Sequence, residues 1–222
     1  MKAGFFIAGT DTGAGKTTFA VALLRRFNAA GVRAAGMKPV AAGTTHGLNG
    51  DVEALMEASS PGLERKLVCP YLFEPPIAPH LAAAEAGVRI DLAFILQTFN
   101  ILSKIAECIV VEGVGGFRVP LNERDDSADL AQRLGLPVIL VVGMRLGCLS
   151  HALLTQEAIR NRGMSLAGWV ASRVDPHMAR AEQSIGALGE RMQAPLIADI
   201  PFRPAADFPV RLEPLWPMPG SR

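Results

Sequence analysis

A glycine-rich segment near the N-terminus constrains this chain more than any other feature of its sequence. Residues 9–18 read Gly-Thr-Asp-Thr-Gly-Ala-Gly-Lys-Thr-Thr, directly after the apolar run Phe5–Ala8 and directly before a stretch whose apolar residues have helical spacing. A glycine-rich turn between a buried strand and a helix points backbone N–H groups and the positive end of the helix at a phosphate. We therefore expect a phosphate-binding loop, in which Lys16 contacts the β- and γ-phosphates of a nucleotide and Thr17 ligates Mg²⁺.

The spacing of this loop departs in one place from the usual pattern. The pattern G-x-x-x-x-G-K-[ST] places a glycine where Thr10 stands, whereas the first glycine here is Gly9, one residue earlier. The alternative is a glycine-rich strand-to-helix turn that binds no nucleotide. Packing alone does not readily explain G-x-G-K-T-T at such a junction, so we favour the nucleotide site.

Short apolar runs alternate with longer helical patterns along the chain, which predicts an α/β fold. The expected strands, each suited to burial on both faces, are Phe5–Ala8, Ala34–Met37, Cys108–Val111, Val138–Val142, Leu166–Ala171 and Leu196–Ile200. The expected helices are Lys16–Ala30, Leu92–Ile105, Ser127–Leu134, Leu149–Asn161 and Met178–Met192. Strands that alternate with helices form a mostly parallel sheet with helices on both faces, and with the phosphate loop this predicts a fold like that of P-loop NTPases.

Two segments interrupt the alternation. Residues 39–80 are rich in Gly, Pro and Thr, and we expect a long functional loop there with one short helix, Asp51–Ala58. From Pro201 onward, repeated prolines exclude a long helix, so we expect this tail to pack irregularly over the rest of the chain. A chain of 222 residues at about 150 residues per domain favours one domain over residues 1–222.

Composition excludes several other classes of protein. The net charge of +1 makes no general case for binding to nucleic acid or to a membrane surface, and no apolar run reaches the roughly 20 residues that span a bilayer. The apolar start of the chain ends at Thr10, before the core of a signal peptide has formed. Three widely spaced cysteines exclude a disulfide framework and fit a reducing cytoplasm, where we expect the protein to reside.

Two acidic residues and a lysine stand where a phosphate loop needs a metal ligand and positive charge. Glu112 follows the run Cys108–Val111, at the carboxyl edge where ligands of α/β folds bind, although it could instead be a solvated residue at the end of a strand. Asp51 could be a metal ligand or the N-cap of its helix. Lys38 closes the second expected strand and could act at the same edge or lie on the surface.

Several longer stretches together resemble the ATP-dependent dethiobiotin synthetase family. The resemblance runs from residue 3 to about residue 202. It rests on G-T-D-T-G-A-G-K-T at 9–17, A-G-M-K-P-V-A at 35–41, V-E-G-V-G-G at 111–116, P-V-I-L-V-V-G-M-R-L-G-C-L-S-H at 137–151 and L-A-G-W-V-A at 166–171. The displaced glycine of the phosphate loop is part of the family's own pattern.

The resemblance implies a reaction and a set of site residues. ATP and Mg²⁺ would drive the closure of 7,8-diaminononanoate and carbon dioxide to dethiobiotin, through a carbamate and a carbamic-phosphoric anhydride. Lys38 and Lys16 would be the catalytic residues, and the Mg²⁺ ligands would be Thr17, Asp51 and Glu112. The implied nucleotide contacts are Thr12, Gly13, Ala14, Gly15, Lys16, Thr17, Thr18, Asp51, Glu112, Gly113, Val114, Gly115, Ser172 and Pro201. The implied substrate contacts are Thr12, Lys38, Pro79, Leu146, Gly147 and Ser150.

The resemblance further implies a homodimer whose substrate site is shared, because residues 145–151 of one subunit would hold the substrate's carboxylate in the other. Some positions depart from the family. The family often has serine at Ala42 and asparagine at Ser150 and Ser172, and Ser172 would face the base of the nucleotide. Selectivity for the base, the effect of Ala42 and the role of the tail after Phe202 therefore stay open.

Two other classes of protein share parts of this pattern. A partitioning-type ATPase, which acts as a nucleotide-dependent switch, usually carries a lysine at the position of Asp11. A related amidating synthase would need a further domain with a nucleophilic cysteine, for which 222 residues leave no room.

Overall fold

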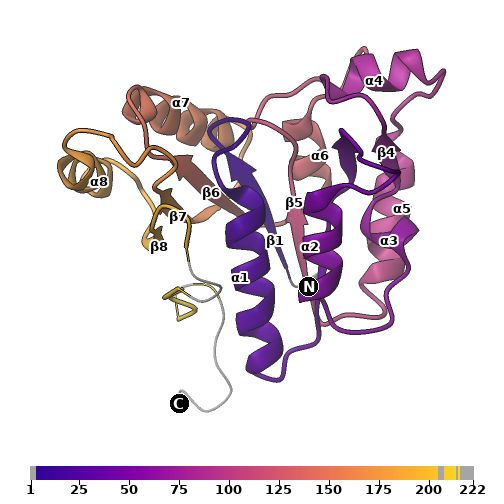
Figure 1. The fold of residues 1–222 in the computed structure, drawn as a ribbon, viewed down its shortest axis with the longest axis horizontal. Helices are drawn as coiled ribbons and strands as arrows, with labels where there is room; N and C mark the ends of the chain where they lie inside the picture. Colours follow the sequence, from indigo (N-terminus) through magenta and orange to yellow (C-terminus); the bar gives the residue numbers. More distant parts are fainter. Residues whose placement is uncertain (1–3, 205–207, 214, 216–222) are drawn as a thin grey trace.

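The computed structural model describes residues 4–204, 208–213 and 215, and a six-stranded parallel sheet lies at its centre (Figure 1). The strand order is β2-β5-β1-β6-β7-β8. Its strands are β1 (Gly4–Gly9), β2 (Ala34–Met37), β5 (Cys108–Glu112), β6 (Val138–Gly143), β7 (Leu166–Ser172) and β8 (Leu196–Ile200). The predicted strands and the predicted α/β class are confirmed, with ends that differ by one residue at most.

Helices cover both faces of this sheet (Figure 1). On one face α1 (Lys16–Ala29) and α2 (Gly50–Ala58) pack against the side chains of β1 and β5 that point toward them. The opposite face is covered by α5 (Leu92–Leu102), α6 (Ser127–Leu134), α7 (Cys148–Asn161) and α8 (Ala181–Gly189). Alternate residues of each strand enter one or the other core, because successive side chains of a strand point to opposite faces.

The register of the central strands brings their carboxyl ends together. Ile7 of β1 pairs with Glu112 of β5, and Met37 of β2 pairs with Val111 of β5. Residues that follow β1, β2 and β5 therefore emerge at one edge of the sheet, although up to about a hundred residues separate them in the sequence.

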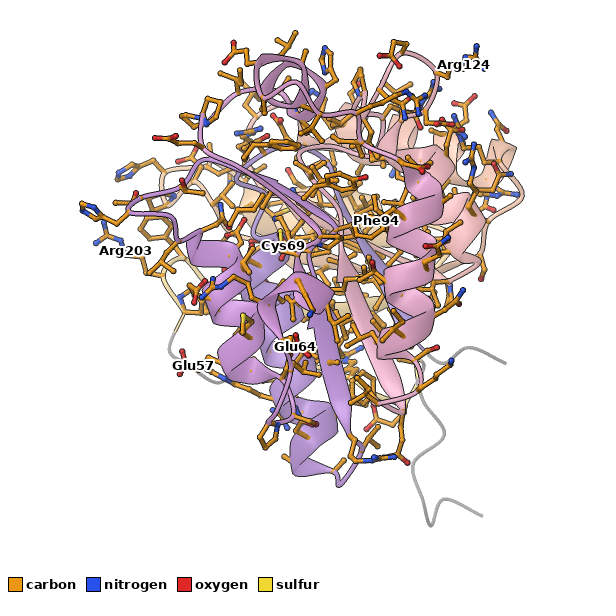
Figure 2. The ribbon with its side chains drawn as sticks, turned by 90° about the vertical axis from the view of Figure 1, so that its right-hand side faces the viewer. Glu57, Glu64, Cys69, Phe94, Arg124 and Arg203 are labelled. Atoms are coloured by element: carbon orange, nitrogen blue, oxygen red, sulfur yellow. The ribbon has the colours of Figure 1, made fainter. Side chains whose placement is uncertain are left out.

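Residues 39–80 are more structured than predicted. They contain β3 (Val40–Ala42) and β4 (Tyr71–Phe73), which form a second, parallel two-stranded sheet, together with α2 and α3 (Arg65–Val68). The following α4 (Pro79–Glu85) begins inside the same segment. Figure 2 shows this side of the molecule, where Glu64 and Cys69 flank α3 and Phe94 lies on α5. The prediction of a long loop was wrong because strands of three residues are too short to show a periodic pattern.

Two helices differ from their predicted ends by more than one residue. Arg180 adopts a left-handed conformation with φ +59°, so α8 begins at Ala181 rather than at Met178, and it ends at Gly189 rather than at Met192. Helix α5 ends at Leu102 rather than at Ile105, and residues 103–105 form a turn. Apolar residues at helical spacing continue past the observed ends of both helices, so the spacing predicted helices that are too long.

The described part of the C-terminal segment packs as predicted, without helix or strand. Phe208, Val210 and Leu212 are buried against the α1 side of the sheet, and the Arg211 N–H donates to the carbonyl of Ile197. Of the prolines on which the prediction relied, those at 214, 217 and 219 lie outside the described residues. Among the described residues, no helix has both the length and the apolar character to cross a bilayer.

Replacing Phe27 with alanine should destabilise the fold more than any exposed aromatic substitution. The Phe27 ring is fully buried on α1 and stacks on Phe5 of β1, with ring centroids 6.2 Å apart. Phe27→Ala removes this packing, and we expect the free energy of unfolding in urea to fall by about 3–5 kcal/mol. The control Phe94→Ala removes a half-exposed ring that meets Tyr71 edge-on, for which we expect a loss of about 1 kcal/mol. Equal losses in the two variants would contradict the assignment of Phe27 to the core.

Candidate active site

A cavity of about 820 Å³ opens at the carboxyl edge of the sheet. Its walls come from the β1–α1 loop, the end of β2, the start of α2, the β4–α4 segment and the loop after β5. The lining residues are Asp11, Thr12, Gly13, Gly15, Lys16, Thr17, Thr18, Lys38, Ala41, Ala42, Asn49, Asp51, Pro76, Ile77, Ala78, Pro79, Glu112, Val114, Gly115, Gly116 and Val119.

The β1–α1 loop has the backbone form of an anion site. Gly13 and Gly15 have positive φ values of 70° and 93°, which favour glycine, and Gly15 forms the N-cap of α1 without a side-chain cap. The first N–H groups of α1 therefore have no partner within their own helix and are directed at the cavity. A β-carbon on Gly9 would lie 3.0 Å from Cδ and Nζ of Lys16, so the displaced glycine makes room for the lysine side chain.

Lys16 is buried and its ammonium group is held by backbone carbonyls. Nζ donates to the carbonyl of Asp11 at 3.0 Å and to that of Gly115 at 2.5 Å. Burial and the nearby charge of Lys38 lower the pKa of Lys16 to about 8. A polyanion in the cavity would hold this lysine in its charged form, because a nearby negative charge favours the ammonium ion.

Lys38 lies directly after β2 and joins the two acidic residues. Its Nζ donates to Oδ2 of Asp51 at 2.8 Å and to Oε1 of Glu112. Burial alone would lower the pKa of Lys38, but the two carboxylates more than offset it, and the pKa is raised above its usual value. The alternative of a surface lysine is wrong, since only 5% of Lys38 is exposed.

Glu112 is the last residue of β5 and is only 1% exposed, so the alternative of a solvated strand end is wrong as well. Burial raises the pKa of Glu112 despite the opposing charge of Lys38. Asp51 lies nearer to solvent. Its burial would raise the pKa, but Lys38 holds it below the usual value. Asp51 is not the N-cap of α2, because the Asn49 side chain accepts from the Val52 N–H at 3.3 Å and takes that role.

The three predicted metal ligands lie together. Thr17 Oγ1 donates to Glu112 Oε1 at 2.8 Å, and Lys38 Nζ donates to both Asp51 Oδ2 and Glu112 Oε1. The second carboxylate oxygen of Glu112 is buried and has no partner among the described residues. One hydroxyl, two carboxylates and an unpartnered buried oxygen fit Mg²⁺, which takes oxygen ligands and completes its shell with phosphate oxygens and water.

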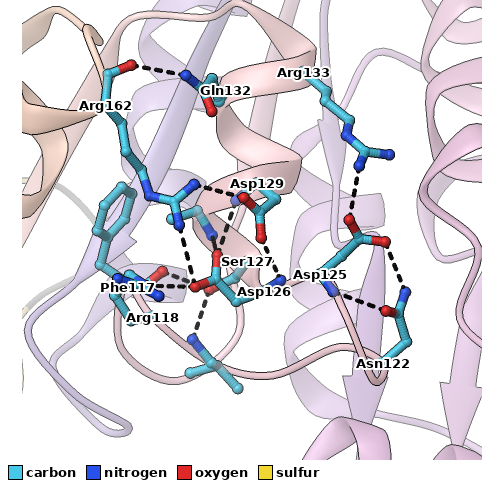
Figure 3. A network of polar contacts seen from close by, with 12 residues as sticks. Phe117, Arg118, Asn122, Asp125, Asp126, Ser127, Asp129, Gln132, Arg133 and Arg162 are labelled. Atoms are coloured by element: carbon cyan, nitrogen blue, oxygen red, sulfur yellow. Dashed lines mark hydrogen bonds and ion pairs between the residues drawn. The ribbon is translucent and has the colours of Figure 1, made fainter.

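The loop after β5 forms the opposite wall, and a polar network fixes it (Figure 3). The buried Ser127 hydroxyl at the start of α6 donates to the carbonyl of Phe117 at 2.6 Å and accepts from the Val119 N–H at 3.1 Å. Asp126 caps α6, and Arg162 at the end of α7 pairs with both Asp126 and Asp129. The network holds the segment that carries the cavity residues Gly115 and Val119. Sequence reasoning missed it, although the order Asp126-Ser-Ala-Asp129 is a capping pattern.

Several predicted site residues do not line this cavity. Leu146, Gly147 and Ser150 are not among its lining residues, and Pro201 is exposed beyond β8. Ala14 and Gly113 are buried behind the walls, and a β-carbon on Gly113 would lie 3.1 Å from the Phe6 ring. Ser172 is buried under the phosphate loop, where its Oγ lies 2.3 Å from the position that a β-carbon of Gly15 would take. Its predicted role at the base of the nucleotide stays a prediction.

Sequence reasoning also left some lining residues without a role. Asn49 is buried, and its side-chain oxygen Oδ1 caps α2. Its Nδ2 donates to the carbonyl of Gly43 at 2.7 Å, so the side chain joins the start of α2 to the residue after β3. An asparagine just before a helix could have indicated the cap. Asp11 lines the cavity and pairs with Arg145 from the β6–α7 loop, a contact that no local pattern signals.

A family model described as an AAA domain matches residues 3–210. A relative from Aromatoleum aromaticum, ATP-dependent dethiobiotin synthetase BioD, is 54% identical over 222 residues and covers 97% of each chain. A relative of the same name from Nitrosospira multiformis is 52% identical and covers 91% of this chain and 89% of its own.

Solved structures show the same fold at low sequence identity. Chloroplast FtsY from Physcomitrella patens superposes with a TM-score of 0.57 at 16% identity, and the match covers 98% of this chain and 66% of that one. A ParA family ATPase from Chlorobium tepidum gives 0.54 at 13% identity, covering 90% and 85% of the two chains. At such identities the likeness concerns the arrangement of the sheet and helices, which is that of P-loop NTPases.

Proposed function

Because the chain belongs to the ATP-dependent dethiobiotin synthetase family, we propose that the cavity at the carboxyl edge of its sheet is the active site of this ligase. The protein makes dethiobiotin in an ATP-dependent step of biotin biosynthesis. The observation that supports this placement is the convergence of Lys16, Lys38 and Glu112 on one cavity behind a phosphate-binding loop. The reaction brings several anions together, and buried ammonium groups at this edge meet that need.

The substrates that we propose are 7,8-diaminononanoate, carbon dioxide and ATP. One amine takes up carbon dioxide as a carbamate, whose oxygen attacks the γ-phosphorus while ADP leaves. The second amine then attacks the carbonyl carbon, phosphate leaves and the cyclic urea closes. Phosphoryl transfer of this kind depends on positioning and on neutralising charge, and few groups need to change their covalent state.

The residues of the phosphate loop hold the triphosphate in this proposal. Backbone N–H groups of residues 13–18 surround the β- and γ-phosphates, and Lys16 turns from its backbone acceptors to them. Thr17, Asp51 and Glu112 hold Mg²⁺, which when bound neutralises charge on the phosphate oxygens. Lys38, between these carboxylates and the cavity, binds the carbamate and the γ-phosphate. Thr12 and Pro79, which also line the cavity, contact the diamine.

We further infer that the active protein is a homodimer with shared sites. Leu146, in the loop before α7, is 96% exposed. Leu149 and Leu154, which follow on α7, are exposed as well. Gly147 caps α7 in a left-handed conformation without a side-chain cap. The Cys148 N–H donates to the carbonyl of Arg145, and the N–H groups of Leu149 and Ser150 that follow are available to bind a carboxylate. Because this loop does not line the cavity of its own chain, we expect it to serve the site of the second subunit.

Placing a glutamate at Gly147 should block binding of the diamine carboxylate. A β-carbon at this position has open space around it, and the new carboxylate would repel the substrate's own. We expect Gly147→Glu to raise the apparent KM for the diamine at least about tenfold, while the KM for ATP stays within about threefold. Gly147→Gln is the matched control, since it carries the same backbone strain at φ +93° without the charge. An unchanged diamine KM in Gly147→Glu would place the carboxylate elsewhere.

Mixing two impaired variants, assayed at a diamine concentration well below the KM of Gly147→Glu, tests the shared site directly. Chains with Gly147→Glu and chains with Lys38→Ala would form mixed dimers in which one site has an intact lysine and an intact loop. We expect the mixture to be more active than either parent after subunit exchange. Activity no higher than that of the parents, with exchange verified by mass spectrometry, would exclude the shared site.

One assay tests the proposed reaction against the main alternative. The purified protein is incubated with the diamine, bicarbonate, Mg²⁺ and ATP, and mass spectrometry monitors the cyclic urea. We expect product only when all four are present and none after removal of Mg²⁺ with EDTA. A switch-type ATPase of the ParA kind would hydrolyse ATP without the diamine and form no cyclic urea.

A further inference from the structure

An acidic side chain lies inside the phosphate-binding loop, where it would oppose a triphosphate. The Asp11 carboxylate accepts the N–H of Thr12 through Oδ1 at 2.7 Å, while the Asp11 carbonyl holds Lys16 Nζ at 3.0 Å. Asp11 also lines the cavity, and about half of its side chain is exposed. A full negative charge at this position opposes the binding of a triphosphate, because like charges repel.

A cation from a distant part of the sequence meets this carboxylate. Arg145 Nη2 donates to Oδ2 of Asp11, so both carboxylate oxygens are engaged. Arg145 follows β6, where the Met144 N–H donates to the carbonyl of Ser172 at 2.7 Å and the Cys148 N–H donates to the carbonyl of Arg145 at 3.0 Å. The guanidinium therefore extends from a fixed backbone toward the β1–α1 loop.

The Arg145–Asp11 ion pair contributes little to the stability of the protein. Arg145 and Asp11 side chains are 40% and 49% exposed, and ion pairs at such positions contribute little to folding. The position of the pair points to a role in the site instead, because the pair joins the phosphate loop to the loop before α7. We expect the pair to affect the binding of a polyphosphate more than it affects folding, because it neutralises the Asp11 carboxylate.

We propose that Arg145 is a positioning residue for the nucleotide, which neutralises Asp11 and holds its carboxylate against the β6–α7 loop. With Arg145 in place, the N-terminal half of the phosphate loop carries no net charge and the positive charge of Lys16 acts on the phosphates. Without it, Asp11 is an unpaired anion beside the triphosphate. This inference rests on the proposed placement of ATP in the phosphate loop.

A double-mutant cycle tests the inference. We expect Arg145→Ala to raise the KM for ATP about tenfold at low salt, while kcat changes by about twofold or less. Adding Asp11→Asn should remove the unpaired charge, so the double variant should return to within about threefold of Asp11→Asn alone. Arg145→Lys should keep most of the affinity. The defect of Arg145→Ala should also shrink in 0.5 M salt, a change that a purely structural role would not produce.

Controls separate this effect from unfolding and from failure of the proposed site. Arg33→Ala breaks the exposed pair with Glu107 at the opposite edge of the sheet, and we expect an unchanged KM for ATP. Lys16→Ala should lose nucleotide binding, and retention of binding there would refute the site itself. An unchanged KM in Arg145→Ala would refute the role of Arg145. A defect that persists in the double variant would also overturn the proposal, since Arg145 would then contact the phosphates directly.

Discussion

Lys38→Ala should bind nucleotide and turn over at least about a hundredfold more slowly than the unchanged protein. The Lys38 ammonium contacts both Asp51 and Glu112, at the point where charge would pass from the carbamate to the γ-phosphate. A preorganised cation at such a point acts chiefly on the transition state. We therefore expect the loss in kcat, measured by steady-state kinetics, with a KM for ATP within about threefold.

Lys38→Met and Lys38→Arg test whether the lost rate comes from the missing charge or from unfolding. Removing Lys38 leaves Glu112 buried without its cation, which costs on the order of 3–5 kcal/mol when a buried pair is broken. Lys38→Met fills the same space and should be as inactive, whereas Lys38→Arg keeps the charge and should recover part of the rate. Lys66→Ala removes a surface lysine paired with Glu64 and should leave the rate unchanged. Turnover of Lys38→Met near that of the unchanged protein would exclude Lys38 from the mechanism.

Gly15→Ala should abolish nucleotide binding at usual concentrations. At φ +93° an alanine is strained by about 1–2 kcal/mol, and its β-carbon would lie 2.3 Å from Oγ of Ser172. The loop must move to relieve this contact, and the N–H groups that bind the phosphates move with it. We expect the Kd for ATP, measured by titration calorimetry, to rise at least about a hundredfold, which corresponds to a loss of about 2.8 kcal/mol of binding free energy.

The matched control for Gly15 is a glycine with the same kind of backbone and no neighbour. Gly163 has φ +70° and open space where a β-carbon would lie, so Gly163→Ala should lose about 1–2 kcal/mol of stability and bind ATP normally. Partial recovery of binding in Gly15→Ala with Ser172→Gly would separate the contact from the strain. Normal ATP binding by Gly15→Ala would show that the loop does not approach the phosphates as closely as proposed.

The sequence identified most of the sheet and the phosphate loop because both are local patterns. Apolar runs of four to six residues located every strand of the main sheet to within one residue. The glycines and Lys16 located the loop, since a strand-to-helix turn of that composition is hard to explain other than as a phosphate-binding loop. Within residues 39–80 the same reasoning located α2 to within one residue. It missed β3 and β4, which have only three residues each and depend on each other for their hydrogen bonds.

The candidate site could be predicted only in part. Glu112, Asp51 and Lys38 each had an alternative on local sequence, and the alternatives failed once burial and neighbours were known. The resemblance to a family assigned roles to these residues, and the structure brings them within hydrogen-bonding distance. The contact of Ser172 with Gly15 had no local signal. The capping pattern at Asp126 indicated the start of a helix, but not that Ser127 and Arg162 would hold the loop after β5.

The sequence alone determined the class of fold and the presence of a phosphate-binding loop, because periodicity and turn chemistry act over a few residues. Tertiary structure decided which of the polar residues meet. The strand order places β5 between β2 and β1, so Glu112 reaches Lys38 across 74 residues and Thr17 across 95. Arg145 likewise meets Asp11 across 134 residues, because β6 lies beside β1. Such pairings depend on how strands associate through backbone hydrogen bonds, in which every residue type can accept and every type except proline can donate. The side chains therefore carry little record of them.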